Sequence, residues 1–412
     1  LSNLSDDRMR HAKSGQWWVD HPEFALANNS VSYTERPDME TFMREWTSLV
    51  ESKSGERGIF NREASKRQAE RNGRRDSGYE FGTNPCSEII LRDRQFCNLS
   101  EVVVRSGDTF ESLKGKVRIA AILGTLQATL TDFRYLSKKW KQNTEEEALL
   151  GVSLTGIMDH PVLSGETSWG AKETGDNWSG GELSLSNTLE GLREVAVETN
   201  EEWAKKLGIN QSVAITAVKP SGTVSQLVDS ASGIHPRYSE YYVRTVRADV
   251  KDPLAKYMAD AGFPYEADVM KPDTTMVFSF PMKAPHEAVF RNDRNAMEQL
   301  EHWLLYQRHW CEHKPSVTVY VKDHEWMEVG AWVYKYFDEV SGVSFLPHSD
   351  HSYKQAPYQE ISEGEYLELL QKMPEAEWAS LGSYETEDRT EGSQTMACVG
   401  GACEVVDIGG VS

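Results

Sequence analysis

The sequence predicts an α/β protein in which parallel strands alternate with helices. Apolar residues recur at helical spacing in four separate stretches, and short β-rich runs lie between these stretches. Strands that are separated by helices are typical of an α/β layer or an α/β barrel. The 412 residues contain no internal repeat and are enough for two or three domains.

The first predicted helix follows Asp38, a residue type that caps helix N-termini. Apolar residues recur at helical spacing from Met39 to Val50, and Gly55 is a natural stop. The same spacing predicts further helices over about 113–133, 189–207 and 300–306.

Three β-rich runs are predicted strands, and they cover 213–218, 276–280 and 316–321. The first of them follows Gly208, which ends a predicted helix, and precedes a Pro-Ser-Gly turn. Helix, strand and turn therefore alternate in the way that the α/β prediction requires.

Two segments do not follow this pattern. Residues 61–80 are densely charged and are predicted to form an exposed excursion. From about Leu381 the chain is rich in Gly, Ser, Thr and acidic residues and has no periodic apolar face, so it is predicted to be a mobile tail. The predicted organisation is a domain over 1–380 and a tail over 381–412.

The composition excludes several classes of partner. The 64 acidic residues exceed the 44 basic residues by 20, which argues against a nucleic-acid groove or an anionic membrane surface. The chain contains no apolar run of the roughly 20 residues that span a bilayer and no signal-peptide pattern. Five cysteines, an odd number, do not suggest a disulfide scaffold, so a reducing cytoplasm is predicted.

The cysteines differ in their surroundings. Cys311, next to Trp310 in a helical stretch, is interpreted as a core residue. Cys398 and Cys403 lie five residues apart, with two glycines between them, in the predicted tail. They are interpreted as a redox dithiol on a flexible arm with a reach of roughly 20 Å.

The segment Asn84-Pro85-Cys86-Ser87-Glu88 combines an amide, a thiol and a carboxylate. If the segment is extended, residues 84, 86 and 88 point to the same side and can share one pocket. The alternative is a turn with a buried cysteine and a solvated glutamate. Cys97 follows eleven residues after Cys86.

These motifs, together with the terminal cysteine pair, resemble a ribonucleotide reductase. The short spacing between Cys86 and Cys97 is similar to that of the adenosylcobalamin-dependent class II, monomeric type, and the chain resembles its C-terminal catalytic portion. Further segments that resemble the family, in the same order, are 27–30, 54–61, 151–156 and 219–223.

The resemblance implies part of a ten-stranded α/β barrel with an inner finger loop that carries Cys86, plus a flexible C-terminal tail. It implies that a thiyl radical on Cys86 takes the hydrogen atom from the ribose 3′ carbon. Glu88 would be the base for the 3′ hydroxyl, and Asn84 would hydrogen-bond the sugar. Cys97 would be one member of the dithiol that supplies two electrons.

The resemblance also implies the remaining partners. Cys398 and Cys403 would re-reduce the internal disulfide, and a thioredoxin-like protein would re-reduce them. The phosphates of the nucleotide would lie on the loop of Ser221, Gly222, Thr223, Val224 and Ser225, where main-chain N–H groups and hydroxyls gather. Adenosylcobalamin is implied as the cofactor, without an Asp-x-His-x-x-Gly cobalt ligand and without another metal.

The sequence departs from the family in one respect. The second cysteine of the active-site pair belongs to an N-terminal half of the family's barrel, and no cysteine precedes Cys86 here. Together with Leu1 in place of Met, this predicts a truncated chain or a separate N-terminal subunit, and no turnover by this polypeptide alone. Two alternatives are a nucleotide-binding or assembly fragment without chemistry, and a thiol oxidoreductase that uses only Cys398 and Cys403.

Overall fold

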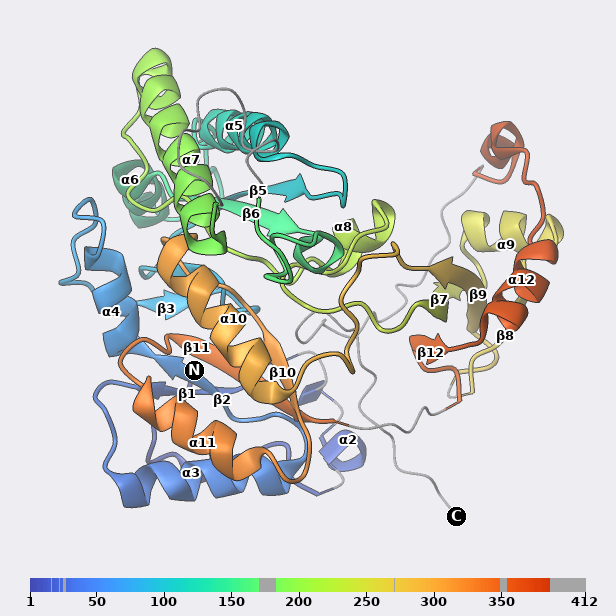
Figure 1. Cartoon of the computed structure of the whole chain (residues 1–412), viewed down its shortest axis with the longest axis horizontal. Coiled ribbons are helices and arrows are strands. Elements are labelled where there is room, and N and C mark those ends of the chain that lie inside the picture. The colour runs from blue at the N-terminus through green and yellow to red at the C-terminus, as the bar shows by residue number, and fades with distance from the viewer. Residues whose placement is uncertain are drawn as a thin grey trace. The chain divides into compact units, whose positions relative to one another are not determined.

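The computed structural model describes residues 1–15, 17–21, 23–24, 27–169, 183–269, 271–348 and 354–385. These residues form two compact units (Figure 1). The larger unit contains residues 1–236 and 287–348, and the smaller unit contains residues 237–286 and 354–385. The two units are described separately below.

The helices of the larger unit confirm the predicted helical stretches. Asp38 accepts a hydrogen bond of 2.8 Å from the Thr41 N–H, as a helix cap does, and Gly208 ends a later helix with a left-handed φ of 69°. In chain order the helices are α1 (Asp7–Arg10), α2 (Trp17–Asp20), α3 (Met39–Ser52), α4 (Arg62–Glu70), α5 (Phe110–Gln127), α6 (Lys138–Glu147), a 3₁₀ turn (Ile157–Asp159), α7 (Leu185–Leu207), α8 (Gly222–Leu227), α10 (Ala296–His309) and α11 (Trp326–Lys335).

The strands of this unit form one four-stranded sheet and two strand pairs. They are β1 (Ser30–Tyr33), β2 (Gly58–Asn61), β3 (Gly82–Thr83), β4 (Ile90–Leu91), β5 (Asn98–Val103), β6 (Leu150–Thr155), β10 (Thr318–Val321) and β11 (Gly342–Pro347). The order β1-β2-β11-β10 forms one sheet, in which β1–β2 and β10–β11 are parallel and β2–β11 is antiparallel. β5 and β6 form a parallel pair.

The predicted strand 213–218 joins these two sheets. On one side the Val152 N–H donates to the Ile215 carbonyl at 2.8 Å, and on the other side the Ser316 N–H donates to the Val218 carbonyl at 2.9 Å. The resulting order is β5, β6, residues 213–218, β10, β11, β2 and β1. The mixed α/β class is therefore confirmed, and within the described ranges this series does not close into a barrel.

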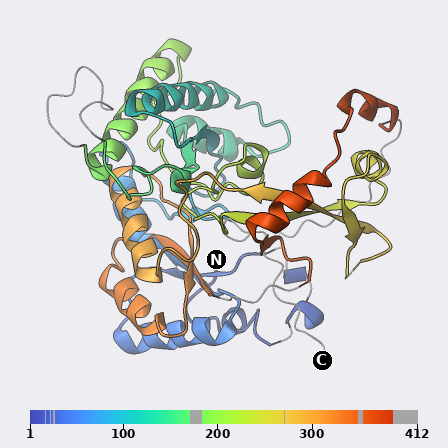
Figure 2. The same ribbon diagram turned by 45° about the vertical axis from the view of Figure 1, so that its right-hand side comes forward.

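Helices cover this series and bury the core. α3 and α11 lie side by side in both ribbon views, and α10 packs against both α11 and β10 (Figures 1 and 2). Trp303, Trp310 and Phe345 are completely buried between them, and Cys311 is 1% exposed, as predicted for a core thiol. No helix within the described residues is long and apolar enough to cross a membrane.

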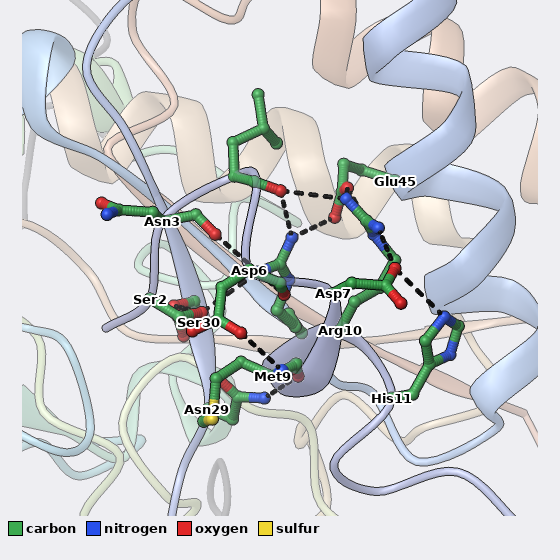
Figure 3. A network of polar contacts seen from close by, with 12 residues as sticks. Ser2, Asn3, Asp6, Asp7, Met9, Arg10, His11, Asn29, Ser30 and Glu45 are labelled. Atoms are coloured by element: carbon green, nitrogen blue, oxygen red, sulfur yellow. Dashed lines mark hydrogen bonds and ion pairs between the residues drawn. The ribbon is translucent and has the colours of Figure 1, made fainter.

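The N-terminal residues are fixed to this core by a buried ion network (Figure 3). Glu45 on α3 accepts hydrogen bonds of 2.7 Å from both Arg57 and Arg10. Ser2 pairs with β1, because its N–H donates to the Ser30 carbonyl and its carbonyl accepts from the Ser32 N–H, both at 2.9 Å. This network fixes the entry to β1 and β2, which border the site described below.

The prediction that residues 61–80 form an exposed excursion is wrong. α4 buries Ala64 and Gln68, and the Arg75 side chain is 0% exposed. The Arg75 guanidinium forms an ion pair of 2.8 Å with Glu147, and it also donates to the Ile90 carbonyl at 2.9 Å. The charges of this segment are therefore partly internal and anchor the β3–β4 hairpin.

The smaller unit is an antiparallel sheet with three short helical segments. Its strand order is β12 (Tyr358–Glu360), β7 (Tyr241–Asp249), β9 (Thr275–Lys283) and β8 (Tyr265–Ala267), and its helical segments are α9 (Pro253–Asp260), α12 (Glu363–Gln371) and η3 (Trp378–Ser383). The predicted strand 276–280 lies within β9. Tyr384 donates to Asp260 at 3.1 Å, so the start of the predicted tail belongs to this unit, and residues from 386 onward lie outside the described part.

Candidate active site

Cys86 lies on a tight turn at the tip of the β3–β4 hairpin. The Ser87 N–H donates to the Asn84 carbonyl at 2.9 Å, and Ser87 has a left-handed φ of 66°. The Asn84 Oδ1 accepts from the Ile89 N–H at 3.0 Å. The segment is thus a turn and not an extended strand, and the predicted alternation of residues 84, 86 and 88 is wrong.

A distant segment before β10 holds this turn. The Lys314 N–H donates to the Glu88 carbonyl at 3.2 Å, and the Ser316 hydroxyl donates to the Cys86 carbonyl at 2.6 Å. The Lys314 ammonium donates to the Ser87 hydroxyl at 2.7 Å. Residues 86, 87 and 88 are therefore each fixed by a separate hydrogen bond from this segment.

Glu88 is a buried carboxylate without a partner. Its exposed fraction is 0%, and neither carboxylate oxygen has a hydrogen-bond partner among the described residues. A buried carboxylate without a hydrogen-bond partner costs free energy. The turn therefore presents two carboxylate oxygens that are available to accept hydrogen bonds from a ligand.

Both nearby thiols are held in the neutral form. Burial raises the pKa of Cys86, and the Glu88 carboxylate raises it further, against an opposing effect of Lys219. Burial also raises the pKa of Cys97, again with a contribution from Glu88. Cys86 and Cys97 thus share the electrostatic field of Glu88, and a protonated thiol is the form that can give a hydrogen atom.

Cys97 lies at the start of β5, against β6. A Cβ atom at Gly151 on β6 would lie 3.3 Å from its Sγ, so the glycine leaves room for the thiol. Cys86 and Cys97 are both free, and the buried Cys311 is a third free thiol outside this site. Cys398 and Cys403 lie outside the described residues.

A second carboxylate, Glu101 on β5, is partly buried and was not predicted from the sequence. Burial raises the pKa of Glu101, with opposing effects of Ser221 and Lys219. The Ser221 hydroxyl donates to the Glu101 Oε2 at 2.6 Å. Cys97 immediately precedes β5, so a period-two pattern that continues from Glu101 back to Cys97 is the sequence signal that links the two residues.

The predicted phosphate loop 221–225 forms the start of α8. The hydroxyls of Ser221 and Ser225 are buried and are already used, because Ser221 bonds to Glu101 and Ser225 donates to the Ser221 carbonyl. Thr223 and Val224 are exposed. The groups that remain for a ligand are the main-chain N–H groups of Gly222, Thr223 and Val224 and the Thr223 hydroxyl.

A polar pocket adjoins the Cys86 turn. Its walls are Asn28, Asn29, Ser30, Ser54, Gly55, Glu56, Gly58, Ile59, Pro85, Cys86, Ser87, Lys314, Ser316, Val317, Thr318 and residues 342–346. Asn28 fixes one side, because its Nδ2 donates to the Pro85 carbonyl at 2.9 Å. The buried Asn29 Oδ1 and Glu56 Oε2 have no hydrogen-bond partner in the described part of the chain.

No group of three or more His, Cys, Asp or Glu side chains within the described ranges could hold a metal ion. The groups that this geometry brings together are neutral thiols and a buried carboxylate. The pocket supplies hydroxyl and amide groups for a polar ligand.

Comparison with known proteins identifies relatives of one kind, although no family model matches the sequence. The adenosylcobalamin-dependent ribonucleoside-triphosphate reductase of Lactobacillus gasseri is 29% identical in an alignment of 363 positions that covers 82% of this chain and 47% of the relative. The enzyme of the same name from Levilactobacillus brevis is 27% identical in an alignment of 431 positions, gaps included, that covers 98% of this chain and 56% of the relative. The chain spans about half the length of the curated relatives it matches.

A solved structure shows the same fold. The crystal structure of a B12-dependent (class II) ribonucleotide reductase matches with a TM-score of 0.72 and 24% sequence identity, over 93% of this chain and 55% of that chain. The alpha subunit of the class Id ribonucleotide reductase of Actinobacillus ureae matches with a TM-score of 0.50 and 10% identity. In sequence and in fold, the chain is therefore similar to about half of an adenosylcobalamin-dependent ribonucleoside-triphosphate reductase.

Proposed function

We propose that the chain carries the radical site of a ribonucleotide reductase, which converts ribonucleotides to 2′-deoxyribonucleotides for DNA synthesis. The observation that supports this most directly is the Cys86 turn, where a neutral thiol and the partnerless Glu88 carboxylate are held beside a polar pocket. A sugar C–H bond is too strong for polar chemistry, so a radical must remove the hydrogen atom. Cys86 is the proposed thiyl radical.

Each neighbouring residue has a proposed role. Glu88 accepts the proton of the 3′ hydroxyl, and the Asn84 amide hydrogen-bonds the sugar. The 2′ hydroxyl leaves as water, and two electrons come from a pair of cysteine thiols, which become a disulfide. Cys97 is proposed as one member of this pair, and Cys398 and Cys403 re-reduce it with electrons from a thioredoxin-like protein.

The substrate is proposed to be a ribonucleoside triphosphate, because the curated relatives are named ribonucleoside-triphosphate reductases. Its phosphates would lie against the main-chain N–H groups of Gly222, Thr223 and Val224, where helix α8 begins. The side chains of Ser221 and Ser225 would stabilise this loop, since both hydroxyls form hydrogen bonds inside the protein.

Adenosylcobalamin is the proposed cofactor, because the relatives' names specify dependence on it. When bound, it supplies the radical chemistry that removes a hydrogen atom from a thiol. The polar groups of the pocket beside Cys86 suit a polar nucleoside-like group, since the buried Asn29 Oδ1 and Glu56 Oε2 have no partner among the described residues and Asn28 and Ser54 line the same pocket. These residues would orient that group next to the Cys86 thiol.

The remaining partner is proposed to be a polypeptide segment that supplies the other half of the barrel and the second thiol of the pair. It is either the preceding half of a longer chain or a separate subunit, and the matched share of the relatives supports either form. The acidic net charge of −20 argues against a nucleic-acid or membrane partner, and a cytoplasmic location is proposed from the thiol chemistry.

The proposal is tested by deoxyribonucleotide formation from ribonucleoside triphosphates with adenosylcobalamin and a dithiol. We expect no sustained product from the 412 residues alone, and turnover when a polypeptide that supplies the other half of the barrel is added. Cys86→Ser should abolish this turnover, whereas Cys311→Ala, a change at a core thiol, should retain it. Activity of the Cys86→Ser variant would contradict the catalytic role and favour an assembly fragment.

A further inference from the structure

A lysine side chain is completely buried beside the Cys86 turn. Lys314 has an exposed fraction of 0%, and none of the described carboxylates lies within the 4.0 Å ion-pair distance of its ammonium. Burial lowers the pKa of Lys314 to about 7, against the opposing effect of the Glu88 carboxylate. A buried ammonium without an ion-pair partner costs free energy. The presence of Lys314 at this position therefore indicates a role other than stabilising the fold.

Two strands form a cradle for this ammonium at the antiparallel junction of β2 and β11. The Nζ lies 5.6 Å from the centroid of the Phe60 ring on β2. A Cβ atom at Gly342 on β11 would overlap with the Nζ, so only glycine leaves room for the charge at this site. The ammonium is thereby confined to one place next to the turn.

From this place the ammonium reaches the residue that follows Cys86. It donates to the Ser87 hydroxyl at 2.7 Å, and Ser87 has a φ of 66°. A left-handed backbone at a residue with a side chain costs free energy and persists only where its surroundings impose it. Lys314 also donates its main-chain N–H to the Glu88 carbonyl at 3.2 Å, so it holds both the strained residue and the one that follows it.

We propose that Lys314 is a positioning residue of the Cys86 site. Its ammonium holds Ser87 in the left-handed conformation that presents the Cys86 thiol to the pocket, and its charge lies in the field of the partnerless Glu88 carboxylate. The roles of Cys86 and Glu88 in this inference rest on the proposed function. The control of the turn by Lys314 does not depend on turnover and can be measured separately.

The first test is alkylation of the full 412-residue chain with iodoacetamide, measured for each cysteine by peptide mass analysis. In Lys314→Met we expect Cys86 to react roughly fivefold or more faster, because the loosened turn exposes its thiol. Cys97 and Cys311 should react at unchanged rates. The thermal midpoint should stay equal or rise, since a buried charge is removed.

Two further variants keep the inference falsifiable if Lys314→Met does not fold. Gly342→Ala retains the lysine but fills the place of its ammonium, and it should also accelerate Cys86 alone. Ser87→Ala should accelerate Cys86 and abolish the additional effect of Lys314→Met in the double variant, because Lys314 is inferred to act through Ser87.

Three results would overturn the inference. The first is an unchanged alkylation rate of Cys86 in the Lys314→Met and Gly342→Ala variants. The second is equal acceleration of all three thiols together with a lower thermal midpoint. The third is an effect of Lys314→Met on Cys86 that is as large in the Ser87→Ala variant as in the unmodified chain. Failure of the proposed function would appear elsewhere, as turnover of Cys86→Ser, and would leave these alkylation rates unaffected.

Discussion

At the scale of single residues, burial determines the ionisation of the thiols at the Cys86 site more than charge pairing does. Glu88 is buried without a hydrogen-bond partner in the described ranges, and its field extends to Cys86 and Cys97. The consequence is a pair of thiols that resist ionisation, which distinguishes them from the reactive thiolates of polar thiol chemistry. A site of this kind suits hydrogen-atom transfer and protects the cysteines from electrophiles.

This electrostatic role of Glu88 predicts a change in thiol reactivity. Glu88→Gln removes the carboxylate that raises the pKa of Cys86, so Cys86 should ionise at lower pH. We expect faster alkylation of Cys86 at pH 8, because a larger fraction of the thiol is then ionised. The buried Cys311 serves as the internal control, and an unchanged Cys86 rate would show that burial alone sets its reactivity.

At the scale of elements, His313 connects β4 to β6 beside the site. Its Nδ1 accepts from the Ile90 N–H at 3.2 Å, and its Nε2 lies 3.0 Å from the Leu150 carbonyl, to which a neutral ring donates. Burial lowers the pKa of His313 to about 3. The bond from the Ile90 N–H requires the neutral ring, because a protonated Nδ1 cannot accept.

This arrangement predicts a loss of stability in acid. The unfolded chain binds a proton at His313 near pH 6.5, whereas the folded chain does so only near pH 3. The free energy of unfolding should therefore fall as the pH decreases from about 6.5 to 3, by at most about 1.4 kcal/mol per pH unit for this group. His235, with a pKa lowered to about 4, adds to the effect.

Urea unfolding at pH 7.0 and pH 5.0 measures this dependence. His313→Gln should have lower stability at pH 7.0 and a smaller difference between the two pH values than the unmodified chain. An identical pH difference in the variant would assign the acid sensitivity to other groups.

Gly151 on β6 supports a second prediction at this scale. A Cβ there would lie 2.5 Å from the Leu99 Cδ2 and 3.0 Å from the Ile89 Cδ1, so Gly151→Ala should lower the free energy of unfolding by about 1–3 kcal/mol. Gly115 on α5, with nothing within 4 Å of such a Cβ, is the matched control. Gly115→Ala should stabilise by about 0.5–1 kcal/mol, and denaturant titrations of both variants would distinguish a steric effect from a general effect of alanine.

The elements also show what the sequence could predict. Helix caps such as Asp38 and Gly208 were correct because their hydrogen bonds are local. The prediction that residues 84–88 are extended was wrong, since the turn depends on hydrogen-bond partners more than 220 residues away, at Lys314 and Ser316. The segment 61–80 was misread for the same reason, because its Arg75 pairs with a residue 72 positions later.

At the scale of the whole molecule, the strand series ends in β5, which among the described strands pairs only with β6. An unpaired strand edge can pair with another chain. On α5, which packs on β5, Ile119, Leu123 and Leu126 are exposed by 61%, 58% and 40% and follow one another at helical spacing. The proposed missing half of the barrel would cover this edge.

The isolated chain is therefore predicted to self-associate through this region. Ile119→Lys combined with Leu123→Lys should reduce the apparent mass in light scattering after size exclusion, because it places two charges on the apolar stripe. Met327→Lys on α11 changes an equally exposed apolar residue, at 71%, far along the chain and serves as the control. Equal effects of the two changes would indicate general solubility and not a specific surface.

The hydrogen bonds from Lys314 and Ser316 to the Cys86 turn also determine when this turn can form during folding. They join residues 227 and 230 positions apart, and such long loops must close before these contacts can form. At the usual pace of synthesis of about 5–20 residues per second, residue 316 leaves the ribosome more than ten seconds after Cys86. During that interval the Cys86 thiol of the nascent chain is exposed to solvent and is not subject to the burial that raises its pKa in the folded protein. Cys86 is therefore expected to be most easily oxidised before the turn forms.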